Sequence, residues 1–387
     1  MISKKIAFII GFIVFIVAGG ASYVYFSRST VGSKAPEVAY KSPVANDAGG
    51  VDLSSGPKTE ECPMNGKLMT KAQRDVWEKH RPMGVMIENH TEARPQSGIS
   101  TADIVYEAVA EGGITRFLNI FYCADAKTIG PVRSARMYFL RILEEYGANP
   151  LYVHVGGANT PGPANALGEI NNLGWDGYND MNQFAVPFPY YYRDYERLPN
   201  RATEHTMYAA TAKLWDYANK TRKLTEVDEK GKRWDTNFVK WKFRDDAPAA
   251  SRGTTNKISL TFWSQFQGDY GVVWTYHKDT NSYTRENGGK PHLDKNTGKP
   301  LEAKNIFVIF AKESPANDGY EGGHLLYAVI GGGDGIFFQD GNVVKGTWTK
   351  KDEKTRMKFF DATGKELSIV RGQVFVEIQP TGNKVTY

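Results

Sequence analysis

The chain has 387 residues, a formal net charge of +5, and 41% hydrophobic and 24% charged residues, which is the composition of a folded globular protein. A positive charge this small argues against nucleic-acid binding. Two cysteines exclude a four-cysteine zinc site, an iron–sulfur centre and a disulfide-stapled scaffold. Aromatic residues make up 13% of the chain and glycine is frequent, which favours β-structure joined by tight turns.

The first predicted element is a membrane anchor. Residues 6–26 form an uncharged apolar run of 21 residues, which at about 1.5 Å per residue could cross the hydrocarbon core of a bilayer as a helix. Two lysines precede the run and one arginine follows it closely, which predicts a single-pass protein with a cytoplasmic N-terminus and an extracytoplasmic body. Small residues at Gly19 and Ala21 leave signal cleavage open, although the aromatic stretch 23–26 favours an uncleaved anchor.

A flexible linker is predicted at residues 27–70, because this stretch is rich in Ser, Gly, Pro, Ala and Lys and has no apolar period. Cys62 falls in this stretch, and Cys123 ends a predicted strand. Outside the cytoplasm the two cysteines could form a disulfide, but the sequence equally allows two separate thiols.

Two folding units are predicted after the linker. An N-terminal α/β domain covers 71–222, with predicted strands at 83–88, 104–111, 114–123 and 151–155 and predicted helices at 134–145, 164–171 and 207–219. A charged, aperiodic connector follows at 223–254. A β-rich C-terminal domain covers 255–387, with predicted strands at 258–263, 272–277, 306–310, 325–330, 335–338, 343–348, 357–360 and 374–378.

No H-E-x-x-H, G-x-S-x-G or P-loop motif is present, so the candidate site depends on clusters of polar residues. The turn Gly112-Gly113 predicts a hairpin, and period-2 alternation then places Glu107, Glu111 and Arg116 on one face. These three residues form either a structural salt-bridge cluster or one wall of a polar cleft.

Arg133 and Arg136 lie three residues apart at the predicted start of helix 134–145, where free N–H groups and the helix dipole attract anions. They are therefore predicted to clamp an anionic ligand, with Arg136 contributing more because Arg133 lies nearer solvent. The alternative is that Arg136 only neutralises Glu107 or Glu111.

Polar residues that could hydrogen-bond a ligand or transfer protons lie at the ends of two predicted strands. Glu88, Asn89 and His90 follow one strand, His154 lies late in another, and His205 precedes the last helix of the domain. Three histidines and a carboxylate could hold zinc, but their irregular spacing favours no metal, and we expect no cofactor.

Long stretches resemble the YerB family, bacterial lipoproteins built on an extracytoplasmic domain of unknown function. The matching stretches are 81–90, 93–98, 102–107, 111–117, 129–136, 154–157, 287–292, 346–348 and 372–375. The resemblance implies an α/β fold, a layered sandwich of two sheets and a helix layer, followed by a β-rich domain. It implies no activity. The chain departs from the family in having an apolar run in place of a lipobox cysteine, and Thr203-Glu204-His205-Thr206 in place of a Pro-His-Asn motif.

The sequence as a whole predicts a membrane-tethered bacterial cell-envelope protein that binds an anionic cell-wall component or an envelope protein, without a nucleic-acid partner. The predicted ligand-binding residues are Glu88, Asn89, His90, Glu107, Glu111, Arg116, Arg133, Arg136 and His154. One alternative is an envelope hydrolase or transferase that uses Glu88, Glu107 or Glu111 as acid/base, assisted by His154. A second alternative is a scaffold for cell-wall synthesis or division proteins.

Overall fold

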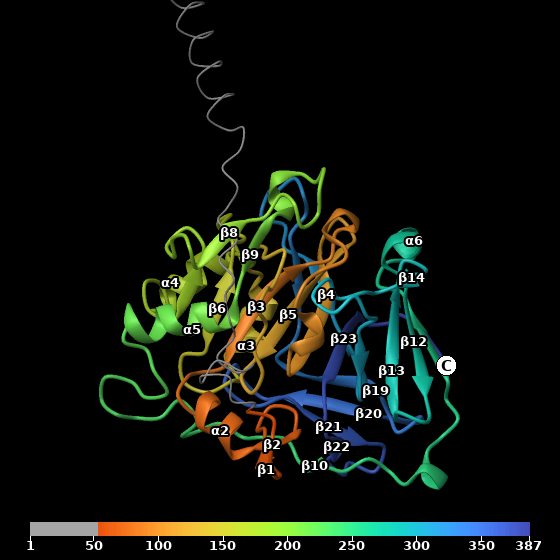
Figure 1. The fold of residues 1–387 in the computed structure, drawn as a ribbon. Helices are drawn as coiled ribbons and strands as arrows, with labels where there is room; N and C mark the ends of the chain where they lie inside the picture. Colours follow the sequence, from red (N-terminus) through yellow and green to blue (C-terminus); the bar gives the residue numbers. More distant parts are fainter. Residues whose placement is uncertain (1–52) are drawn as a thin grey trace, which may run out of the picture. The chain divides into compact units, whose positions relative to one another are not determined.

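The main sheet has ten strands, drawn from both predicted domains (Figure 1). The computed structural model describes residues 53–387, so the predicted anchor at 6–26 and most of the predicted linker lie outside the described residues. Among residues 53–387, no helix is long and apolar enough to cross a membrane. In spatial order the strands are β21 (Lys358–Asp361), β20 (Asn342–Lys350), β19 (Gly331–Gln339), β16 (Asn305–Ala311), β23 (Val374–Pro380), β4 (Ile104–Glu111), β5 (Ile114–Phe121), β3 (Met83–Glu88), β6 (Leu151–His154) and β7 (Asp180–Asn182).

The two halves of the chain meet inside this sheet. Strand β23 lies parallel to both β16 and β4, with Val374 opposite Ile104 and Glu377 opposite Glu107. The predicted units 71–222 and 255–387 therefore share one hydrogen-bonded ladder. Whether each unit folds alone stays a prediction.

A β-bulge in the hairpin β4–β5 alters the predicted grouping of charged residues. The turn forms as predicted, with positive φ at Gly112 and Gly113. The register then shifts between Val109 and Glu111, so that Arg116 pairs with Ala108 while Glu107 pairs with Phe117. Because successive side chains point to opposite faces, Glu107 and Arg116 lie on opposite faces of the sheet, and the prediction that they share one face was wrong.

One face of the main sheet carries a helix. Gly84 of β3 lies so close to helix α3 (Met137–Leu143) that a Cβ there would be 2.6 Å from Leu143 Cδ1. Glu88 and Arg116, which are cross-strand partners, share this face. The other helices are α2 (Lys71–Trp77), α4 (Ala166–Asn172), α5 (Thr211–Lys220) and α6 (Gln267–Tyr270), and the short 3-10 helices are η1 (Thr91–Ala93), η2 (Ile99–Thr101), η3 (Thr203–His205), η4 (Ala249–Ser251) and η5 (Ser264–Phe266).

A second sheet packs on the other face. Its strands are β14 (Lys290–Pro291), β13 (Ser282–Asn287), β12 (Val272–His277), β11 (Lys257–Leu260) and β24 (Val385–Thr386), with β15 (Glu302–Ala303) also paired to β13. The Trp274 ring of β12 contacts Phe375 of β23 edge-on, at 4.9 Å between ring centroids. The predicted α/β class and the layers of two sheets and helices are confirmed, and the C-terminal half supplies the second sheet.

Four two-stranded sheets complete the fold, and one of them lies in the predicted linker. They are β1 (Lys58–Glu61) with β2 (Leu68–Thr70), β8 (Tyr191–Arg193) with β9 (Met207–Ala209), β10 (Phe243–Arg244) with β22 (Ile369–Val370), and β17 (Glu313–Pro315) with β18 (Leu325–Tyr327). Cys62 is fully buried and forms a disulfide with Cys123. The C-terminal end of the predicted linker is therefore ordered structure.

Candidate functional site

A cluster of ionisable side chains lies on the α3 face, where β3 ends. Glu88 is buried, with Oε1 3.1 Å from Arg133 Nε and Oε2 2.8 Å from His205 Nδ1. His205 Nε2 lies 3.6 Å from Glu92 Oε2, and the His90 and His205 rings are almost parallel with centroids 4.8 Å apart. We call Glu88, His90, Glu92, Arg133 and His205 the histidine site.

Three separate segments position these residues. His90 follows β3 and caps η1, because its Nδ1 accepts a 3.2 Å hydrogen bond from the backbone N–H of Glu92. Arg133 is fixed between β3 and β6, since its N–H donates to Met86 O and its carbonyl accepts from Val155 N–H. His205 ends the short helix η3. The backbone thus holds the cluster together even though its members are far apart in sequence.

The two histidines differ in their electrostatic surroundings. The hydrogen bond with Glu88 is the main reason that the pKa of His205 is raised above its ordinary value. Burial, followed by repulsion from His205, lowers the pKa of His90. The site therefore holds one imidazole that favours a proton and one that favours the neutral form.

Arg133 is the residue of the histidine site whose guanidinium group is partly exposed to solvent. Its side chain is 26% exposed, and it contacts Glu88 through Nε. Among residues 53–387, its Nη1 and Nη2 atoms donate no hydrogen bond. Two guanidinium donors are therefore available to a ligand, and a planar fork of this kind matches a carboxylate or phosphate.

Arg136 and Arg116, in contrast, both form ion pairs with Glu111. Glu111 accepts from Arg116 Nη2 at 2.9 Å and from Arg136 Nε at 2.9 Å, and Arg136 also donates to Ala135 O. Burial raises the pKa of Glu111, but the two guanidinium groups outweigh it and hold that pKa at about 2. Arg136 is 5% exposed, so the structure forms the predicted alternative, neutralisation of Glu111, and does not form a two-arginine clamp with Arg133.

Glu107 and Asn89 lie in the polar core between the two sheets. Glu107 accepts from Thr115 and from Asn89 Nδ2, and it pairs with Arg285 of β13. Glu107 and Asn89 are both fully buried. Both residues belong to a buried hydrogen-bond network between the sheets, and their role there is structural.

His154 is also separate from the histidine site. Its Nε2 lies 2.6 Å from Asp180 Oδ1 and its Nδ1 lies 2.7 Å from Gly156 O, and the ring is fully buried. Sequence reasoning therefore grouped His154 with the site incorrectly and missed Glu92. The available signal was the position of Glu92 two residues after His90 in the segment that leaves β3.

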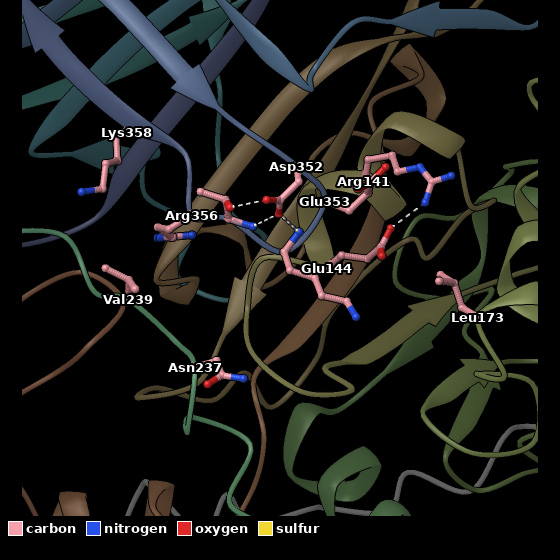
Figure 2. Close-up of a pocket in the computed structure, with 11 residues that line it drawn as sticks. Arg141, Glu144, Leu173, Asn237, Val239, Asp352, Glu353, Arg356 and Lys358 are labelled. Carbon is pink, nitrogen blue, oxygen red and sulfur yellow. Dashed lines mark hydrogen bonds and ion pairs between the residues drawn. The ribbon is translucent and has the colours of Figure 1, made fainter.

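None of these residues lines the pocket of about 760 Å³ that Figure 2 shows. Its lining residues are Arg141, Glu144, Leu173, Asn237, Val239, Asp352, Glu353, Lys354, Thr355, Arg356 and Lys358. Arg141 donates to Glu144 and Glu169, and Arg356 pairs with Glu145. These two arginines are already neutralised, so each offers an anion less than Arg133 does.

Comparison with known proteins places this chain in a family. Residues 69–225 match the model described as "Protein of unknown function (DUF3048) N-terminal domain", and residues 258–376 match the corresponding C-terminal domain. A Bacillus subtilis (strain 168) protein named "Putative lipoprotein YerB" is 32% identical over 335 residues, which is 84% of this chain and 87% of that protein. The chain belongs to this YerB-like family. A crystal structure of YerB from Bacillus subtilis, 27% identical, superposes with a TM-score of 0.66 and covers 85% of this chain and all of the crystallised one.

Proposed function

We propose that this protein is a membrane-tethered, extracytoplasmic envelope protein that binds an anionic ligand at the histidine site, through Arg133. The ligand is a carboxylate or phosphate group of a cell-wall component or of an acidic segment of an envelope protein. The observation that carries the proposal is the open guanidinium group of Arg133, held in place by a buried carboxylate.

Three observations support the location. The relative from Bacillus subtilis carries the name of a lipoprotein, and residues 6–26 of this chain form an uncharged apolar run. The disulfide between Cys62 and Cys123 fits an oxidising compartment outside the cytoplasm.

The chemistry of the histidine site supports the ligand class. Each charge-assisted hydrogen bond is worth roughly 1.5–3 kcal/mol. Two donors on one guanidinium group can hold both oxygens of a carboxylate or phosphate. His205 lies beside Arg133 and carries a raised pKa, so it adds positive charge when it is protonated.

The test is calorimetric titration of the full chain with three probes: inorganic phosphate, a poly(glycerol phosphate) fragment and a muropeptide. Arg133→Ala should weaken the probe that binds by about 10- to 100-fold, because each 1.4 kcal/mol is worth about tenfold. Arg141→Ala is the matched control, since the Arg141 side chain is 25% exposed but already paired with Glu144 and Glu169. Equal affinities of the wild type and Arg133→Ala for that probe, or no binding of any probe, would contradict the proposal.

One observation favours a hydrolase or transferase as a second candidate. Glu88 orients His205 through Nδ1, which leaves Nε2 directed away from Glu88, as in a general base held by a carboxylate. In this case His205→Ala should abolish turnover of a cell-wall substrate, whereas Arg133→Ala should mainly raise KM. Retained turnover in His205→Ala would exclude the acid/base role.

A further inference from the structure

His90, Glu92 and His205 bring together one carboxylate oxygen and two imidazole nitrogens. One potential ligand atom from each residue lies within 4.8 Å of the other two. His90 and Glu92 belong to the segment that leaves β3, and His205 comes from η3. Two histidines and one carboxylate are a common set of ligands for zinc.

Glu88 prepares His205 to be a ligand. Its Oε2 lies 2.8 Å from His205 Nδ1, so a proton on Nδ1 is held there and the lone pair of the neutral ring is on Nε2. Metal-binding histidines regularly donate their second ring N–H to a carboxylate in this way, which fixes the tautomer and the ring orientation. Glu88 is itself buried and held against Arg133.

The separation between His205 and Glu92 fits two ligands of one ion. His205 Nε2 and Glu92 Oε2 are 3.6 Å apart, which is too long for a hydrogen bond. Ligands at about 2.0–2.1 Å from a tetrahedral zinc ion lie about 3.4 Å from each other. A metal ion between these two atoms would therefore need only a small adjustment of an exposed glutamate.

His90 can complete the set by turning its ring. The ring is now nearly parallel to that of His205 and accepts a 3.2 Å hydrogen bond from Glu92 N–H. His90 is only partly buried, so rotation about its side-chain bonds costs little beyond that hydrogen bond.

The charges around the site also suit a divalent cation. Three carboxylates lie at the site, those of Glu88, Glu92 and Glu204. The pKa of Glu204 is lowered first by a hydrogen bond from its own backbone N–H and then by the nearby charges of His205, Arg133 and His90. Arg133 supplies one positive charge.

We propose that His90, Glu92 and His205 bind a divalent transition metal ion, Zn²⁺ by preference, with Glu88 as a positioning residue. The fourth ligand position would be open to water or to an anion beside Arg133. The inference does not rest on the proposed function, because a metal could bind here whether or not Arg133 holds a ligand.

The test is titration of the metal-stripped full chain with Zn²⁺ by calorimetry and with Co²⁺ by visible absorption. We expect one equivalent of Zn²⁺ to bind and Co²⁺ to give the intense bands of four-coordinate N/O ligation. His90→Ala and His205→Ala should each weaken binding by at least about 10-fold, and Glu88→Gln by about 10- to 100-fold. His277→Ala, which removes an exposed histidine on β12, should bind like the wild type.

Two controls are needed. Melting curves of His90→Ala separate a loss of metal binding from a loss of folding, and Arg133→Ala separates metal binding from anion binding. Thermal melts without metal should show that His90→Ala stays folded at the titration temperature, with only the small loss expected from the missing cap of η1, so that its loss of metal is not a loss of fold. Arg133→Ala should keep its Zn²⁺ affinity even if it loses the anionic probe. Failure of the wild type to bind Zn²⁺ or Co²⁺, or unchanged binding in both His90→Ala and His205→Ala, would overturn the inference.

Discussion

Glu107 of β4 and Glu377 of β23 lie directly opposite each other on neighbouring parallel strands, both fully buried. Arg285 of the second sheet pairs with Glu107 and lies 3.7 Å from Glu377 Oε1 through Nε. Burial, and then the proximity of Glu107, raises the pKa of Glu377 well above its ordinary value. Glu377 therefore keeps a proton, while Glu107 neutralises Arg285.

This pair predicts opposite effects for two similar substitutions. Glu377→Gln should be neutral or stabilising at pH 7–8, because glutamine can replace a protonated carboxyl and still accept from Trp274 Nε1. Glu107→Gln should destabilise the fold by up to about 3–5 kcal/mol, because the buried Arg285 then has only Glu377 left, which must lose its proton before it can neutralise the arginine. Chemical denaturation at pH 7 measures both, and similar losses in the two variants would contradict this assignment of charges.

The same pair predicts a pH dependence. The raised pKa of Glu377 means that its contribution to stability is complete below the unfolded-state pKa and is lost as the pH rises toward the folded-state pKa. The difference in unfolding free energy between Glu377→Gln and the wild type should therefore grow from pH 5 to pH 8, by at most about 1.4 kcal/mol per pH unit. A difference that stays constant over this range would show that Glu377 does not titrate there.

Arg136→Ala should lower stability by about 2–3 kcal/mol at pH 7, since it breaks a buried ion pair but leaves Glu111 one arginine, Arg116. Because the pKa of Glu111 is lowered to about 2, its contribution is present above pH 4.5 and is lost as the pH falls toward 2. The gap between Arg136→Ala and the wild type should thus close in acid. Denaturation curves at pH 6 and pH 3 provide the measurement, and a gap that widens at pH 3 would contradict the role of Glu111.

Strands β4 and β23 come from different halves of the chain and pair in one sheet. This pairing predicts that neither half folds stably without the other, in contrast to the two folding units indicated by the sequence. Fragments 71–222 and 255–387 expressed alone would expose β4 and β23 as unpaired edges and would separate Glu107 from Arg285. We expect poorly dispersed amide spectra for each fragment and recovery of dispersion on mixing. Dispersed spectra and cooperative melts for both separate fragments would instead support two independent domains.

The sequence predicted individual strands better than their partners. Strands 83–88, 104–111 and 272–277 have the predicted bounds, because apolar runs between turn residues are a local signal. The bulge in β4 leaves no mark in the alternation of residues, so the face of Arg116 was assigned incorrectly. The strand that carries Arg285 was missed, because its polar residues give no alternating signal and Arg285 is buried against Glu107 of the other half of the chain.

The histidine site was predicted only in part for the same reason. Arg133, Glu88 and His90 were among the predicted ligand residues, since they follow predicted strands or precede a predicted helix. The contact between Glu88 and His205 joins residues 117 positions apart. No spacing rule predicts such a pair, and only the arrangement of β3, η1 and η3 brings it together.

The most direct test of the account is to measure ligand affinity and melting temperature together for Arg133→Ala and Arg136→Ala, using the anionic probe that binds the wild type. The structure predicts that Arg133→Ala loses about 10- to 100-fold in affinity with a smaller fall in melting temperature than Arg136→Ala, because its guanidinium group is partly exposed and Glu88 keeps His205 as a partner. It predicts that Arg136→Ala melts earlier but binds the probe with wild-type affinity per folded molecule, because Arg136 is closed around Glu111. The reverse pattern, in which Arg136→Ala loses affinity and Arg133→Ala does not, would contradict the proposed site.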